Sequence, residues 1–206
     1  MRVLQINSVC GIGSTGRIAS DIHDILIKKG HESYIAYGRD VPRNCNTSIR
    51  IGNNLDNYKH FALTRAFDKH GFGSSKATRD FIKQITWLDP DIVHLHNIHG
   101  YYINIKYLFD YLKESGKPVV WTLHDCWSFT GHCAYFDYAG CDKWKSGCYC
   151  CPEKRSYPAS IFFDSSKSNY QEKKEIFTGV KNLTIVTPSK WLAGLVKQSF
   201  LKEYPV

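Results

Sequence analysis

The first 37 residues hold the pattern that most restricts the fold of this chain. Residues 2–7 are mostly apolar, and a glycine loop at 11–16 follows them. Residues 17–29 then place apolar side chains on one face of a helix, and residues 32–37 alternate like a second strand. This order is a βαβ unit, which implies two parallel strands and a right-handed crossover. The chain is therefore predicted to be an α/β protein.

The remainder of the chain repeats this alternation of strands and helices. Three further apolar runs have the length of buried strands: 91–95, 118–123 and 183–187. Helical spacing is found at 55–69, 76–88, 107–112, 165–177 and 188–200. Residues 38–57 are rich in Asn, Gly, Pro and Arg and are predicted to be irregular. We expect a single Rossmann-like domain over residues 1–206, with a parallel sheet and helices on both of its faces.

Residues 126–158 interrupt the pattern as a cysteine-rich irregular insertion. They show neither helical nor strand period, and so long a structureless stretch in a compact domain is functional, disordered or held by something else. Four of the eight cysteines follow the spacing C-x7-C-x6-C-x2-C: Cys133, Cys141, Cys148 and Cys151. The C-x-x-C pair is typical of zinc sites, and a structural zinc would stabilise a loop without an apolar core. Free thiols and disulfides are the alternatives, and a cytosolic setting favours thiols.

The glycine loop is a candidate phosphate site because it connects a strand to a helix. Gly11, Gly13 and Gly16 allow backbone N–H groups to approach a phosphate, and Arg17 adds a positive charge at the helix start. A tight turn that simply needs glycine explains the loop equally well. A dinucleotide site would also need an acidic residue at the end of the second strand. Arg39 stands close to that position, so NAD is disfavoured.

Polar residues also follow the third and fourth predicted strands, at the edge where ligands of open α/β sheets bind. His96, Asn97 and His99 follow the third strand and are expected to contact a substrate. His124 and Asp125 follow the fourth strand and are the catalytic candidates. A histidine here can donate a hydrogen bond to a sugar hydroxyl or stabilise developing charge; one satisfied by a backbone carbonyl is the alternative. All these groups are expected to share one rim with the glycine loop.

The distribution of charge and hydropathy limits the class of partner. The net charge of +8 is spread over the chain rather than clustered, so nucleic acid is not an expected partner. No stretch approaches the roughly 18 apolar residues of a membrane span, and no signal peptide is recognisable, so a cytoplasmic protein is expected. Basic residues at Lys28–Lys29 or Lys173–Lys174 could still bring it to an anionic inner membrane face.

The motifs together resemble a known family. The sequence looks like the N-terminal half of a GT-B glycosyltransferase of family GT4, in the colanic-acid-type branch that makes capsular or exopolysaccharide. The segments that carry the resemblance run in family order at 1–7, 11–17, 91–100, 121–125, 130–133, 141–144, 148–152 and 187–191. The histidine and glycine motifs alone would not be specific.

The resemblance implies half of a GT-B fold that binds mainly the acceptor, a glycan or lipid-linked molecule. The nucleotide-sugar donor would be held mostly by a second Rossmann-like domain, and the transfer would be retaining, without a catalytic metal. By position, His124 corresponds to the family histidine that reaches the transferred sugar, and Gly13 lies in the loop near the donor diphosphate. This sequence contains no counterpart of the C-terminal donor domain, so the chain alone is expected to be inactive. The alternative function is a non-catalytic, zinc-stabilised binding module.

Overall fold

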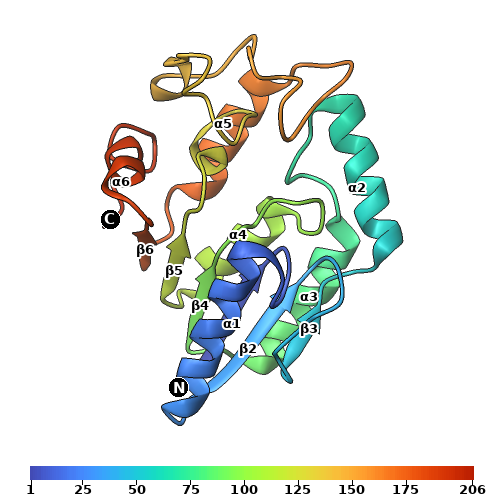
Figure 1. The fold of residues 1–206 in the computed structure, drawn as a ribbon, viewed down its shortest axis with the longest axis vertical. Coiled ribbons are helices and arrows are strands. Elements are labelled where there is room, and N and C mark those ends of the chain that lie inside the picture. The colour runs from blue at the N-terminus through green and yellow to red at the C-terminus, as the bar shows by residue number, and fades with distance from the viewer.

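The computed structural model describes residues 1–206 and contains one six-stranded parallel sheet (Figure 1). Its strands are β1 (Arg2–Asn7), β2 (Glu32–Tyr37), β3 (Ser48–Arg50), β4 (Ile92–Leu95), β5 (Val119–Thr122) and β6 (Leu183–Val186). They lie in the order β3-β2-β1-β4-β5-β6, and every neighbouring pair is parallel. Strand order reverses between β1 and β4, and such a switch point opens a crevice at the carboxyl ends of the strands.

The helices lie on both faces of the sheet, as the sequence predicts. They are α1 (Gly13–Lys28), α2 (Asn54–Phe67), α3 (Ser75–Leu88), α4 (Ile105–Ser115), α5 (Ser166–Phe177) and α6 (Lys190–Val196). In Figure 1, α1 lies in front of the sheet, and α3 and α4 lie behind it. The side of α3 and α4 contains the large apolar core, where Phe109, Trp121 and Phe177 contact one another with ring centroids 4.6–5.4 Å apart. This packing holds β4 and β5 rigidly beneath the crevice.

Several predicted boundaries are wrong; the helix predicted at 188–200, for example, extends only over Lys190–Val196. Residues 38–57 are not entirely irregular, because β3 pairs with β2 at the edge of the sheet. A three-residue edge strand is too short to show a period, and its pairing partner is remote from any local signal. Helix α1 begins at Gly13 rather than at Arg17, so part of the glycine loop is the first turn of the helix.

The cysteine-rich insertion is irregular, as expected, but it contains an apolar core, which was not expected from its sequence. It contains only two short 3₁₀ turns, Trp127–Phe129 and Lys143–Lys145. Phe129, Phe136 and Trp144 are buried in it, with ring centroids 5.4 Å apart for Phe129–Trp144 and 4.8 Å apart for Phe136–Trp144. These aromatic rings join the main core, so the insertion does not depend on a metal alone.

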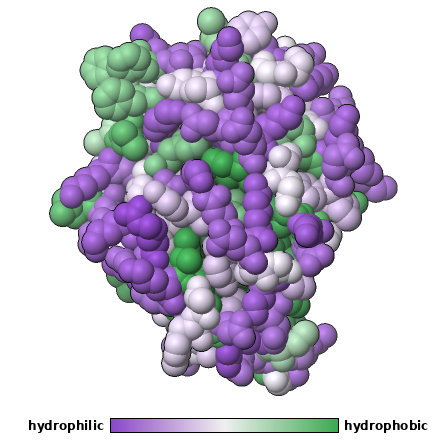
Figure 2. All heavy atoms as spheres, turned by 180° about the vertical axis from the view of Figure 1, so that it is seen from behind, coloured by the Kyte–Doolittle hydropathy of each residue, from purple (hydrophilic) through white to green (hydrophobic).

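Only some of the lysines expected to meet an anionic membrane lie on the surface. Lys28 and Lys29 are exposed, but Lys173 is 1% exposed and cannot meet a membrane, so that part of the expectation is wrong. The face seen in Figure 2 is mostly hydrophilic, with hydrophobic side chains at its upper left and between the hydrophilic ones near its centre. None of the helices combines the length and the apolar character that crossing a bilayer requires.

Candidate functional site

The predicted site residues meet along one edge of the sheet because β1, β4 and β5 are adjacent and parallel. The glycine loop follows β1, His96 to His99 follow β4, and His124 and Asp125 follow β5. Parallel strands direct their carboxyl ends to the same edge, so three segments far apart in the sequence form a common rim.

His124 lies at the end of a chain of hydrogen bonds that runs into the sheet. Its Nε2 is 3.4 Å from Nδ1 of His96, and Nε2 of His96 is 3.1 Å from Oε1 of Gln5. The amide nitrogen of Gln5 donates to the carbonyl oxygen of Ala19 at 3.0 Å. Gln5 and His96 are buried, whereas His124 is half-buried. Burial lowers the pKa of His124, which favours its neutral form.

His96 therefore does not offer a ligand contact of the kind expected from the sequence. It is 1% exposed, and its two ring nitrogens face His124 and Gln5. His94 stacks on it at 4.2 Å between centroids and approaches Thr122 Oγ1 at 2.9 Å. Asn97 is half-buried, and its backbone N–H donates to Asn7 Oδ1 at 3.2 Å.

Asp125 turns away from the rim and braces the start of the insertion. Its Oδ2 lies 2.9 Å from Nε2 of His99, and its Oδ1 accepts a hydrogen bond from the backbone N–H of Trp127 at 2.9 Å. The other nitrogen of His99 is 3.1 Å from the hydroxyl of Tyr157. Burial raises the pKa of Asp125, but His99 and the Trp127 N–H outweigh it and hold that pKa below its usual value. Asp125 and His99 thus lie near the rim but bind each other.

The glycine loop presents an uncapped helix N-terminus to the rim. Gly11 has φ of +69°, and a Cβ there would lie 2.0 Å from the carbonyl oxygen of Arg43, so glycine is required. Gly13 is exposed with nothing within 4 Å of an added Cβ, whereas Gly16 is buried against Val9. No side chain caps α1, and its first turn holds no acidic residue. Free N–H groups and the helix dipole suit a phosphate here.

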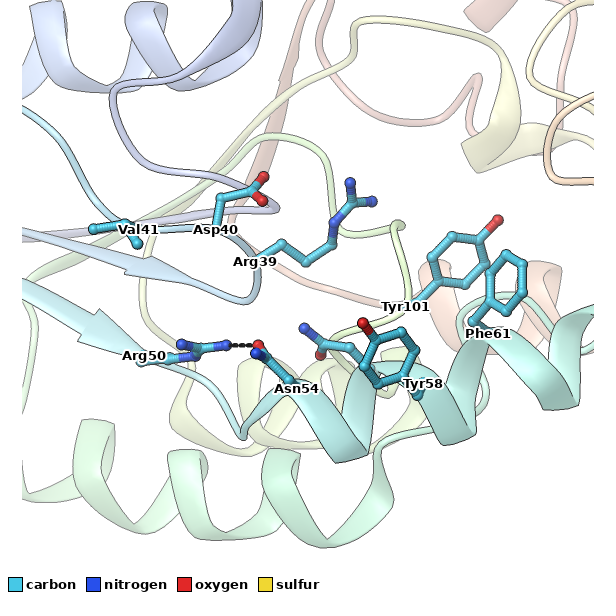
Figure 3. A pocket seen from close by; sticks show the side chains of 9 residues that line it. Arg39, Asp40, Val41, Arg50, Asn54, Tyr58, Phe61 and Tyr101 are labelled. Carbon is cyan, nitrogen blue, oxygen red and sulfur yellow. Dashed lines mark hydrogen bonds between the residues drawn. The ribbon is translucent and has the colours of Figure 1, made fainter.

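A cleft beside this rim was not foreseen from the sequence (Figure 3). It encloses about 520 Å³ between the end of β2, the end of β3 and the first half of α2. Its lining combines two cations with aromatic rings and amides: Arg39, Asp40, Val41, Arg50, Asn54, Asn57, Tyr58, Phe61 and Tyr101. In Figure 3, the Arg39 side chain extends across the cleft toward Tyr101.

Two features of this cleft suit it to a polar ligand. Arg39 makes no salt bridge, and Arg50 is held by the side-chain oxygen of Asn54, which leaves guanidinium N–H groups free. Tyr101 has a left-handed backbone with φ of +70°, a conformation that is costly for a bulky residue. Its ring meets Phe61 at 5.2 Å between centroids. The position after the histidine motif was the only sequence signal for Tyr101.

The four predicted metal ligands lie together in the insertion. Cys133, Cys141, Cys148 and Cys151 line one small cavity that His132 shares. His132 is buried; its Nδ1 pairs with Asp68, and its Nε2 has no hydrogen-bond partner. An unpaired buried nitrogen among thiols fits a metal ligand in chemistry. The side chains are nevertheless not gathered into a metal-binding arrangement, since no group of three or more His, Cys, Asp or Glu is placed to hold an ion.

Lys173 places a buried amino group beside these cysteines. Its Nζ donates to the carbonyl oxygens of Trp127 at 2.8 Å and Thr130 at 3.1 Å, and it lies 3.5 Å from the centre of the Trp127 indole ring. Burial lowers the pKa of Lys173 to about 7, against the opposing effect of Cys148. The lysine ties the insertion to α5, and thiolates nearby would keep it charged.

The comparison with known proteins gives a sequence relative over nearly the whole chain. No protein-family model matches the chain. It is 30% identical over 209 aligned residues to WcaC of Escherichia coli (strain K12), whose own assignment as a colanic acid biosynthesis glycosyl transferase is provisional. The match covers 94% of this chain and 50% of WcaC, so the chain spans about half the length of that relative.

Solved structures give more distant similarities. The glycosyltransferase VinC, crystallised in complex with DTDP, is 17% identical with a TM-score of 0.46 and aligns over 91% of this chain and 49% of its own chain. The spinosyn forosaminyltransferase SpnP is also 17% identical, with a TM-score of 0.49, over 93% of this chain and 47% of its own chain. Neither similarity is close enough to indicate a shared function.

Proposed function

We propose that this chain is the acceptor-side half of a GT-B, family GT4 glycosyltransferase of polysaccharide biosynthesis. The whole enzyme would transfer a sugar, with retention, from a nucleotide-sugar to a glycan or lipid-linked acceptor, and a second domain would complete the donor site. The observation that carries this proposal is the rim on which the glycine loop after β1 and His124 after β5 lie on either side of the end of β4. The match to WcaC over nearly the whole chain supports it.

Each ligand has a place on this rim. The donor diphosphate would lie over Gly13 at the open N-terminus of α1, where backbone N–H groups and the helix dipole favour negative charge. The transferred sugar would lie against the accessible side of His124. The acceptor would occupy the neighbouring cleft, where Tyr58 and Phe61 offer aromatic faces and Arg39 and Arg50 offer donors. Cytoplasmic location, with peripheral contact at the inner membrane, fits such acceptors and belongs to the same proposal.

The test is a transfer assay with the natural polypeptide that carries these 206 residues. Radiolabelled nucleotide-sugars are incubated with a lipid fraction from the producing cells, and label in the lipid fraction is counted. We expect transfer from one donor, and a loss of about 100-fold or more in His124→Ala, because a donor-sugar contact made at the reacting centre is removed. His31→Ala is the control, since His31 lies at the opposite edge of the sheet before β2.

Two results would contradict the proposal. If no nucleotide-sugar labels any acceptor, the proposed glycosyl transfer activity is contradicted. Transfer by His124→Ala at the unsubstituted rate, with the same melting temperature, would remove His124 from the site.

A structural zinc in the insertion is part of the proposal. The four thiols line one cavity, which supports it, and Lys173 would offset the negative charge of zinc thiolates. We expect about one zinc per chain by elemental analysis of protein purified without chelator, because one closed tetrahedral site takes one ion. Cys148→Ser should lose the metal, whereas Cys45→Ser, which lies outside the insertion, should keep it. Absence of metal together with an unchanged melting temperature on chelation would rule this out.

A further inference from the structure

The hydrogen bonds behind His124 fix the direction in which each one runs. The Ala19 carbonyl oxygen can only accept, so the group of Gln5 that faces it at 3.0 Å is the NH₂ of the amide. The oxygen of the same amide therefore faces His96. The usual ambiguity between oxygen and nitrogen of a glutamine is resolved here by a backbone atom.

The orientation of Gln5 decides the tautomer of His96. An amide oxygen only accepts, so Nε2 of His96 must carry the hydrogen across the 3.1 Å contact. Burial lowers the pKa of His96 to about 2, which keeps its imidazole neutral at physiological pH. A neutral imidazole with its hydrogen on Nε2 has a lone pair on Nδ1, and that lone pair points at His124.

The same reasoning passes to His124. Its Nε2 lies 3.4 Å from the Nδ1 lone pair of His96, and the two rings are inclined by only 20° with centroids 5.7 Å apart. That separation is typical of rings meeting edge to edge through a hydrogen bond, in contrast to the 4.2 Å face stacking of His94 on His96. Two lone pairs would repel, so Nε2 of His124 is the donor. Its Nδ1 has no hydrogen-bond partner in the protein and is not fully buried. This nitrogen is therefore accessible.

We propose that Gln5 and His96 are positioning residues that hold His124 as the Nε2–H tautomer, so that its free Nδ1 accepts a hydrogen bond from a hydroxyl of the bound sugar. The sugar part rests on the proposed function. The polarity is opposite to the sequence expectation that this histidine donates. A hydroxyl that can donate at this point is recognised, and a ligand atom that can only accept, such as an ether oxygen, is disfavoured because it would face a lone pair.

The tautomers can be measured in this chain directly. Histidine labelled with ¹⁵N is incorporated, and two-bond nitrogen–proton correlation spectra are recorded near pH 8. We expect His96 and His124 both to show a protonated Nε2 and an unprotonated Nδ1. An Nδ1–H tautomer of His124 in the unsubstituted chain overturns the proposal without any variant.

Variants of Gln5 test the relay itself. Gln5→Leu removes the acceptor, so His96 is free to change tautomer and the His124 signals should move toward a mixture. Gln5→Glu retains an acceptor for His96 and, with its buried carboxyl protonated to donate to the Ala19 carbonyl oxygen, should preserve both tautomers. Gln198→Leu is the matched control, because Gln198 donates only to Gly194 on the surface. Unchanged His124 tautomers in Gln5→Leu overturn the positioning role.

Transfer by the natural polypeptide separates this inference from the proposed function. Gln5→Leu should lower kcat by about five- to tenfold, the value of one hydrogen bond, and leave KM for the acceptor unchanged. Gln5→Glu should restore most of the rate. Unaltered kcat in Gln5→Leu would overturn the positioning role, whereas absence of transfer by every form contradicts the proposed function and leaves the tautomer measurement to decide the relay.

Discussion

At the scale of residues, one acidic side chain decides where the cysteine-rich insertion leaves the sheet. Asp125 binds His99 after β4 and caps the N–H of Trp127 at the first 3₁₀ turn, so it links two strand ends and the insertion. Both contacts are largely buried, with side-chain exposures of 13% for Asp125 and 8% for His99. Charge-assisted hydrogen bonds shielded from water are among the stronger ones. Asp125 therefore serves the shape of the rim rather than the ligand directly.

Asp125→Asn should destabilise the fold by about 1–3 kcal/mol, because the charge is lost from two buried hydrogen bonds. The lowered pKa of Asp125 means that this stability is present above the pKa of an unfolded aspartate, near 4, and is lost as the pH falls through the folded value. Urea unfolding at pH 7 measures the difference. Asp142→Asn, with the side chain 77% exposed, is the control and should change little. Equal effects of the two substitutions would contradict this role for Asp125.

At the scale of elements, close approach between segments holds the rim and the cleft together. Gly38 follows β2, and Tyr102 follows the histidine motif after β4. A Cβ at Gly38 would lie 2.0 Å from Cβ of Tyr102, which leaves no room for any side chain. The Tyr102 hydroxyl in turn donates to the carbonyl oxygen of Asn97 at 2.8 Å. This packing sets the spacing between the cleft and the site of His124.

Gly38→Ala should therefore destabilise the chain by about 1–3 kcal/mol or more, since the added Cβ would overpack the contact with Tyr102. Gly194→Ala in α6 is a matched control, because nothing lies within 4 Å of a Cβ there. That substitution should stabilise the chain by about 0.5–1 kcal/mol through helix propensity. Thermal and urea unfolding of both variants provide the measurement. Effects of the same sign and size would refute the packing argument.

At the scale of the whole molecule, several buried or half-buried histidines are kept neutral. Burial lowers the pKa of His60 to about 3 and of His94 to about 4, and the pKa of His70 lies well below its usual value. Their nitrogens bind hydroxyls and backbone N–H groups, including those of Gly71 and Gly100. Such groups cannot take up protons without unfolding their surroundings.

The fold should consequently lose stability as the pH drops below about 6.5, where the unfolded chain begins to bind protons that the folded chain refuses. Each neutral buried histidine contributes a slope of about 1.4 kcal/mol per pH unit in that range. Urea midpoints at pH 7.5, 6.5 and 5.5 give the total slope. His94→Gln should lower the slope by about 1.4 kcal/mol per pH unit, which is the contribution of one proton. A flat profile from pH 7.5 to 5.5 would show that these histidines do titrate in the folded chain.

The sequence by itself determined the class of fold and the rim of the candidate site. Apolar period, glycine position and strand order are local, and parallel strands must send their carboxyl ends to one edge, so the glycine loop, His96 to His99 and His124 could be placed together. The family resemblance followed from the same motifs. Elements with a clear period, such as α3, were placed correctly, while the three-residue β3 was not.

Only the tertiary structure decided which of those side chains are accessible. His96 and His124 follow neighbouring strands with similar sequence surroundings, yet one is buried against Gln5 and the other keeps a free nitrogen. The cleft of Arg39, Arg50 and Tyr101 likewise joins three separate elements. Exposure and hydrogen-bond direction depend on atoms contributed from 28 to 91 positions away, and no local pattern records them.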